Sequence, residues 1–99
     1  MIRRFEDKVM VVTGAAQGIG RCVAERAAGE GAKVLIVDRS PARDNVVAAI
    51  RANGGVAEAI NVDLETWTGC DEAMEKAQSL WGRIDILVNN VGGTICQTI

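Results

Sequence analysis

The sequence predicts an α/β domain built on a doubly wound parallel sheet, and two observations carry that prediction. Short β-branched runs alternate with longer segments of helical periodicity in the order βαβαβαβ. The runs are apolar on both faces, which is typical of buried parallel strands. With 48% hydrophobic residues, the 99-residue chain suffices for one small domain spanning residues 1–99. Right-handed crossovers then give the strand order 3-2-1-4.

The first half of the chain supplies two strands and two helices. After the strand Lys8–Thr13, a helix over Gly18–Glu30 follows from the apolar recurrence of Ile19, Cys22, Val23 and Ala27, and Gly31 stops it. The strand Lys33–Asp38 comes next. Pro41 suits the first turn of a second helix, whose apolar stripe consists of Val46, Val47, Ala49 and Ile50.

The second half continues the alternation to a fourth strand, after which the predicted sheet stops. Gly54-Gly55 ends the second helix, and Val56–Val62 forms the third strand. A helix over Thr66–Trp81 is predicted to pack through Trp67, Trp81 and an apolar side, and Gly82 closes it. Ile84–Asn89 is the fourth strand, in which Asp85 is expected to be structural.

Composition excludes several functions. A net charge of −2 with no cluster of Lys and Arg predicts no nucleic-acid partner, and apolar runs of strand length predict no membrane span. Met1–Asp7 has no apolar signal region, which favours the cytoplasm. The chain has no His and no CxxC, so no metal site is expected, and Cys22 and Cys70 are interpreted as small buried hydrophobes.

The first strand and the first helix are joined by a glycine-rich loop, Thr13-Gly-Ala-Ala-Gln-Gly-Ile-Gly20. Gly14 permits a sharp turn, Gly18 leaves room for a pyrophosphate, and Gly20 permits close helix packing. The helix N-terminus offers free N–H donors to phosphates. This context, strand before and helix after, predicts a Rossmann-type nucleotide loop. The alternative is a tight turn that uses glycines for packing alone.

Acidic and amide side chains follow the other strands at the same edge of the sheet. Asp38, eighteen residues after Gly20, is suited to bind the adenosine ribose hydroxyls and to repel a 2′-phosphate, which favours NAD over NADP. Arg39 and Arg21 leave a basic route to NADP open. Asp63 is suited to bind the adenine amine or to cap the next helix. Asn89 and Asn90, expected to be buried, tie neighbouring strands and line the cleft.

Together these motifs, with Asp63-Leu64 and Asn89-Asn-Val-Gly92, resemble the short-chain dehydrogenases/reductases over nearly the whole chain. That family has TGxxxGIG and NNAG, and Val91 is the one departure. The resemblance implies an NAD(P)-dependent oxidoreductase acting on alcohols and carbonyls, with homo-oligomeric full-length relatives. The cofactor-binding residues that it implies are Gly14, Gln17, Gly18, Ile19, Gly20, Asp38, Asp63, Leu64, Asn90 and Gly92.

A finer resemblance concerns the substrate. Three segments are similar in sequence to the bacterial cis-diol dehydrogenases of benzoate and toluate breakdown. They are the glycine loop, Val37-Asp-Arg-Ser40 and Asn89-Asn-Val-Gly-Gly-Thr-Ile95. Those enzymes oxidise 1,6-dihydroxycyclohexa-2,4-diene-1-carboxylate, release carbon dioxide and yield a catechol. A 3-oxoacyl or a sugar or alcohol substrate is the alternative.

The family's chemistry uses Ser, Tyr and Lys beyond the fourth strand. This sequence has no Tyr, and its two serines, Ser40 and Ser79, precede that strand. No catalytic residue is therefore assigned, and the chain alone is expected to be inactive, as the nucleotide-binding half of a truncated enzyme. A non-catalytic nucleotide-binding module and a remnant that does not fold stably are the competing hypotheses.

Overall fold

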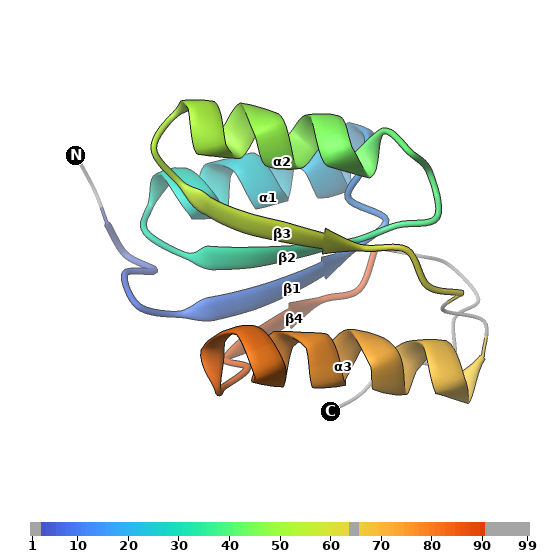
Figure 1. Ribbon diagram of the computed structural model, residues 1–99. Coiled ribbons are helices and arrows are strands. Elements are labelled where there is room, and N and C mark those ends of the chain that lie inside the picture. The colour runs from blue at the N-terminus through green and yellow to red at the C-terminus, as the bar shows by residue number, and fades with distance from the viewer. Residues whose placement is uncertain (1–2, 64–65, 91–99) are drawn as a thin grey trace.

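Seven elements alternate along the chain and form a three-layer α/β structure (Figure 1). The computed structural model describes residues 3–63 and 66–90. Its four strands are parallel and lie in the order β3-β2-β1-β4, so the predicted fold class and strand order are confirmed. The elements are β1 (Val9–Thr13), α1 (Gly18–Gly29), β2 (Lys33–Val37), α2 (Arg43–Ala52), β3 (Val56–Ile60), α3 (Trp67–Trp81) and β4 (Ile86–Val88).

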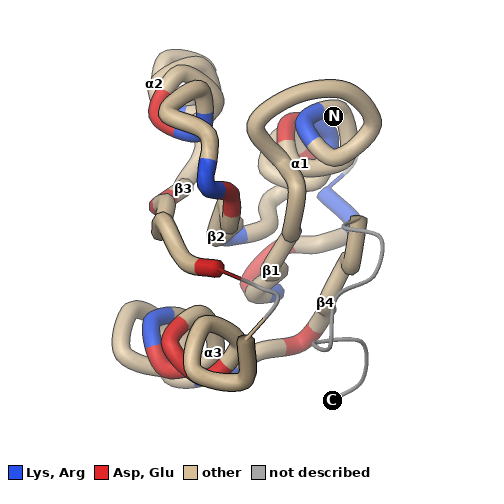
Figure 2. The backbone as a smooth tube through the Cα atoms, turned by 90° about the vertical axis from the view of Figure 1, so that its right-hand side faces the viewer, with Lys and Arg blue, Asp and Glu red and all other residues tan. Residues whose placement is uncertain are grey.

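Each face of the sheet is covered by helix. Helices α1 and α2 pack on one face and α3 packs on the other, as the end-on view shows (Figure 2). Because side chains alternate along a strand, Met10 and Val12 of β1 join the α1–α2 side of the core, whereas Val11 joins the α3 side. Val9 and Val11 are at most 1% exposed, in keeping with the apolar residues that make up β1 before Thr13.

Helix α1 packs through small residues, and this corrects its predicted apolar face. Its buried residues are Gly20, Ala24, Ala27 and Ala28. Ile19 is 75% exposed and Cys22 is also exposed, so their predicted burial was wrong, although Val23 is partly buried against the core. The small side chains let the helix approach the sheet closely, and this rotates the larger residues outward. Cys70, by contrast, is buried as predicted.

Other differences from the predicted elements lie at their ends. Trp67 is 68% exposed at the start of α3, so it is not the packing residue that was predicted, whereas Trp81 packs against the α3 side of the core. Pro41, predicted in the first turn of α2, lies in the turn before it, and its carbonyl accepts a hydrogen bond from the Asp44 N–H at 3.1 Å. Helix α2 therefore begins at Arg43. Strand β4 is shorter than the predicted Ile84–Asn89.

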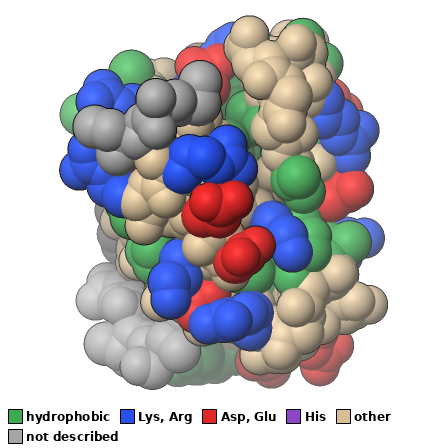
Figure 3. Space-filling model, turned by 90° about the vertical axis from the view of Figure 1, so that its left-hand side faces the viewer, with side chains coloured by type: hydrophobic (Ala, Val, Ile, Leu, Met, Phe, Trp, Pro, Cys, Tyr) green, Lys and Arg blue, Asp and Glu red, His purple; other side chains and the backbone are tan. Residues whose placement is uncertain are grey.

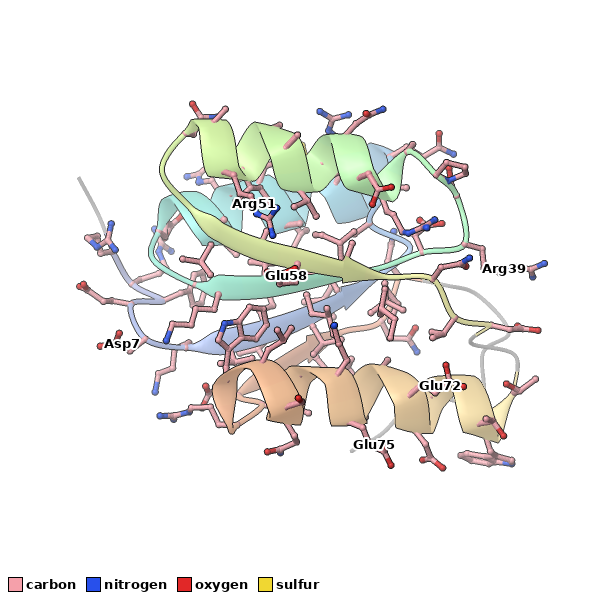
Figure 4. The ribbon with its side chains drawn as sticks, viewed as in Figure 1. Asp7, Arg39, Arg51, Glu58, Glu72 and Glu75 are labelled. Carbon is pink, nitrogen blue, oxygen red and sulfur yellow. The ribbon has the colours of Figure 1, made fainter. Side chains whose placement is uncertain are left out.

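Charged side chains of both signs cover the end of the molecule where the strands begin (Figure 3). Many are paired, as in Arg3–Glu6, Arg4–Glu30 and Arg83–Asp85. At the β3 edge, Arg51 faces Glu58 at 2.9 Å (Figure 4). Across residues 3–63 and 66–90, no helix combines the length and apolar character that crossing a bilayer requires.

Candidate functional site

The loop between β1 and α1 turns sharply at Gly14, at the carboxyl end of the sheet. Gly14 has φ of +63°, a left-handed conformation that favours glycine. Its N–H donates to the Val37 carbonyl at 2.9 Å, which continues the β1–β2 pairing by one residue beyond the strand. The turn therefore leaves the sheet beside Val37, the last residue of β2.

The first turn of α1 begins without a side-chain cap. Gln17 is the N-cap residue in extended conformation, and its side chain accepts no hydrogen bond from the helix. The contrast is α3, whose N-cap Thr66 accepts from the Gly69 N–H at 2.9 Å. Gly18 has φ of +64°, and a Cβ built there would meet nothing within 4 Å. The start of α1 thus has no side-chain cap from Gln17 and has open space at the Cβ position of Gly18, a geometry suited to binding an anion.

Gly20 is required for close packing inside the loop. A Cβ there would overlap the Gly14 carbonyl oxygen and would lie 2.8 Å from Asn90 Nδ2, contacts closer than real Cβ atoms make; the Gly14 carbonyl carbon would be at 3.0 Å. Asn90 Nδ2 donates to the Gly14 carbonyl at 3.3 Å, so the loop, the helix and the end of β4 meet at one point. The predicted packing role of Gly20 has this geometric basis.

Thr13 connects β1 to the residues that follow β4. Its hydroxyl donates to Asn89 Oδ1 at 3.1 Å and accepts from the Asn90 N–H at 2.9 Å, and the residue is completely buried. Asn89 and Asn90 do tie neighbouring strands, as predicted, but both are exposed and not buried. They lie beyond the end of β4, at the edge of the sheet, and not within its core.

Asp38 immediately follows β2 and reaches two loops. Its Oδ2 accepts from the Ala16 N–H at 3.0 Å, and its Oδ1 accepts from the Ser40 N–H at 2.9 Å. The neighbouring Arg39 is exposed and points outward from the carboxyl end of the sheet (Figure 4). The carboxylate is therefore held beside the glycine loop, whereas the adjacent guanidinium is turned away from it.

Of the three remaining predicted residues, Asp63, Leu64 and Gly92, the structure describes only Asp63. Asp63 is exposed after β3, and the cap of α3 is Thr66, so the cap alternative for Asp63 was wrong. The Asp63 backbone carbonyl instead accepts from the Thr66 hydroxyl at 3.0 Å. Leu64 and Gly92 lie outside the described residues. The structure thus brings Gly14, Gln17, Gly18, Ile19, Gly20, Asp38 and Asn90 to one end of the sheet.

Asp85 supports the same strands from their opposite end. Its carboxylate accepts from the Val9 N–H at 2.8 Å and from Arg83 at 2.6 Å. The hydrogen bond from the Arg83 guanidinium, followed by that from the Val9 N–H, lowers the pKa of Asp85 below its ordinary value. The same contact raises the pKa of Arg83. Asp85 is structural, as the sequence predicted.

Comparison with known proteins matches this geometry to a family. The family model described as short chain dehydrogenase matches residues 8–99, which include every element of the sheet. The chain belongs to the short-chain dehydrogenase family. The glycine loop, Asp38 and the Asn89-Asn90 pair are therefore read as parts of a short-chain dehydrogenase, and not as a chance cluster of turn residues.

Two curated relatives of the same name are similar to this chain over almost its whole length. The chain is 52% identical over 93 residues to the 1,6-dihydroxycyclohexa-2,4-diene-1-carboxylate dehydrogenase of Acinetobacter baylyi, covering 94% of this chain and 36% of that protein. It is 50% identical over 97 residues to the Pseudomonas putida protein of the same name, covering 96% and 35%. The chain thus spans about a third of the length of these curated relatives.

Solved structures show the same fold. The crystal structure of a hydroxysteroid dehydrogenase from Escherichia coli matches with a TM-score of 0.88 at 37% identity, over 91% of this chain and 39% of that one. A short chain dehydrogenase from Mycobacterium avium matches with a TM-score of 0.86 at 34% identity, over 89% and 35%. These two structures therefore share the fold of this chain.

Thr13 and Ala16 make hydrogen bonds at this end of the sheet, but neither of them was assigned a role from the sequence. Thr13 was treated only as part of a motif, although a lone hydroxyl ending the apolar run of β1 is a signal for a buried hydrogen-bonding role. Ala16 takes part through its backbone N–H, for which the residue type gives no signal.

Proposed function

We propose that this chain is the NAD-binding portion of a short-chain dehydrogenase that oxidises a cis-dihydrodiol carboxylate. The observation that carries the cofactor proposal is the uncapped start of α1, opened by Gly18, with the Asp38 carboxylate beside the same loop. The pyrophosphate would be held by main-chain N–H groups over Gly18–Gly20, next to Gly14, Gln17 and Ile19. When bound, the nicotinamide supplies the hydride acceptor.

The acidic side chain supports NAD over NADP. Asp38 would accept hydrogen bonds from the adenosine ribose hydroxyls, and its charge would oppose a 2′-phosphate. Arg39, the alternative partner for such a phosphate, points away from the sheet (Figure 4). Asp63 and Leu64 would flank adenine, and Asn90 and Gly92 would bind near the ribose.

Titration of the purified chain with NADH and NADPH tests this proposal. We expect saturable NADH binding at least tenfold tighter than NADPH binding, a difference of about 1.4 kcal/mol. Asp38→Ala should weaken NADH binding and reduce the discrimination, whereas Arg39→Ala should leave NADH affinity unchanged. Absence of saturable binding, or equal affinities for both nucleotides, would refute the cofactor assignment.

The substrate proposal is supported by the two relatives that share half of their aligned residues with this chain and carry the diol-carboxylate name. In the reaction, the diol carboxylate loses a hydride to NAD⁺ and a proton from its oxidised hydroxyl, and loss of carbon dioxide then leaves a catechol. The 99 residues include no Tyr to act as the family's acid–base group. We therefore propose that these residues alone bind the cofactor without turnover.

A chimera tests the substrate and the division of roles. These 99 residues would replace the aligned N-terminal residues of the Acinetobacter baylyi relative, and NADH and catechol would be measured with the diol carboxylate as substrate. We expect turnover by the chimera and none by the 99-residue chain. Turnover by the chain alone, or a folded chimera that binds NADH but forms no catechol, would contradict the proposal.

A further inference from the structure

The Asp38 carboxylate uses each of its oxygens on a different loop. Oδ2 accepts from the Ala16 N–H in the β1–α1 loop, and Oδ1 accepts from the Ser40 N–H in the β2–α2 loop. The two distances, 3.0 and 2.9 Å, are those of well-formed hydrogen bonds. Ala16 is 2% exposed, so its N–H has little access to water as a substitute partner. The carboxylate is therefore already engaged by the protein itself.

These contacts hold the glycine loop at two points. The Gly14 N–H is bonded to the Val37 carbonyl, and the Ala16 N–H is bonded to the next residue, Asp38. Both acceptors are at the end of β2, which is buried and paired on both sides. Hydrogen bonds to an ionised acceptor are roughly twice as strong as neutral ones. The loop is thus fixed to the end of β2, a strand paired on both sides, just before Gln17, the N-cap residue of α1.

We propose that Asp38 is a positioning residue for the glycine loop, separately from any contact with a ribose. By fixing Ala16, the carboxylate sets the direction in which the chain enters α1 and so the direction of the uncapped N–H groups of its first turn. Each carboxylate oxygen has further lone pairs, so ribose hydroxyls can donate to Asp38 without displacing either loop. The importance of this for nucleotide binding rests on the proposed function, but the positioning itself does not.

The role predicts a distinct effect of Asp38→Asn. An amide has one oxygen and one NH₂ group, so it can accept from Ala16 or from Ser40 but not from both in the present geometry. The N–H of the other residue, Ala16 or Ser40, then faces the NH₂ group of the Asn side chain, which is itself a donor. We expect at least one of these two amides, that of Ala16 or that of Ser40, to exchange with solvent at least tenfold faster in the ligand-free Asp38→Asn variant. Asp71→Asn, at an exposed position of α3, is the matched control and should change neither amide.

Nuclear magnetic resonance of the isotope-labelled, ligand-free chain supplies the test. In the wild-type chain we expect a through-hydrogen-bond correlation between the Ala16 amide nitrogen and the Asp38 side-chain carboxyl carbon. This measurement decides the question even if Asp38→Asn does not fold. Absence of the correlation, or unchanged exchange rates of both the Ala16 and the Ser40 amides in a folded Asp38→Asn variant, would overturn the proposal. Titrating the same wild-type sample with NADH tests the cofactor assignment independently, because either result can occur without the other.

Discussion

Replacing Gly20 by Ala adds a methyl group where three segments of the chain meet. The new Cβ would lie 2.8 Å from Asn90 Nδ2 and 3.0 Å from the Gly14 carbonyl carbon, whereas carbon atoms pack favourably at about 3.5–4.0 Å. Because one neighbour is backbone in a left-handed turn, the overlap cannot be relieved by rotating a side chain. Overpacking costs about 1–3 kcal/mol, and we expect about 3 kcal/mol here.

The same substitution at Gly29 is the matched control. Gly29 is in the same helix, its φ is not left-handed, and a Cβ there meets nothing within 4 Å. Gly29→Ala should therefore stabilise the chain by up to about 1 kcal/mol through the better helix propensity of Ala. The two variants should then differ by about 3–4 kcal/mol in the free energy of unfolding.

Urea unfolding followed by far-ultraviolet circular dichroism measures this difference. With a slope of about 1–3 kcal/mol per molar urea, the two midpoints should be separated by more than about 1 M. Gly20→Ala should also lose NADH affinity, because relief of the overlap moves the start of α1 away from Gly14. If Gly20→Ala were as stable as Gly29→Ala, the close packing of loop, helix and Asn90 would not exist in solution.

Three other perturbations follow from the structure. Thr13→Val keeps the side-chain shape but removes the hydroxyl that bonds both asparagines, so it should destabilise the chain by about 1–3 kcal/mol in urea; Thr13→Ser should retain most of the stability. Asp85 has a lowered pKa in the folded chain, so its contribution is present above its unfolded pKa of about 3.9 and is lost as pH falls through the lower folded value. Asp85→Asn should flatten stability against pH in that acid window, and an unchanged profile would show that the Arg83 and Val9 contacts contribute nothing. Exposed Cys22 should react with a thiol reagent in the native chain while buried Cys70 reacts only in urea, as peptide mapping resolves; equal native rates would contradict the packing of α3.

Residues within single elements carried enough information to predict the sheet. β-Branched runs alternating with helical periodicity are local properties, and they correctly indicated the seven elements of the described residues. The order β3-β2-β1-β4 then followed from the right-handed crossovers of a doubly wound sheet. The glycine loop was recognisable because the residues on both sides of it had the periods of a strand and a helix. The nucleotide-binding roles of Gly14, Gln17, Gly18, Ile19, Gly20, Asp38, Asp63, Leu64, Asn90 and Gly92 stay predictions, since no ligand contact tests them.

Packing direction was the main property that local patterns misjudged. In α1 the apolar residues Ile19 and Cys22 suggested one buried face, but the helix turns its alanines to the sheet because their small side chains permit a closer approach. Trp67 was likewise interpreted as a helix-packing residue, yet it lies in the first turn of α3 and is exposed. Hydrophobicity alone therefore fixed the existence of each helix better than its rotation about its own axis.

The sequence by itself determined which segments form strands and helices, where the glycine turn falls and which family the chain resembles, because all of these depend on neighbours along the chain. Only the tertiary structure decided that Thr13 bonds Asn89 and Asn90 and that Asp38 holds Ala16. Those contacts join residues 22 to 77 positions apart, and two of them use backbone N–H groups that every residue except proline possesses. Such a partner is selected by where the sheet brings the chain together, and no residue type marks it in advance.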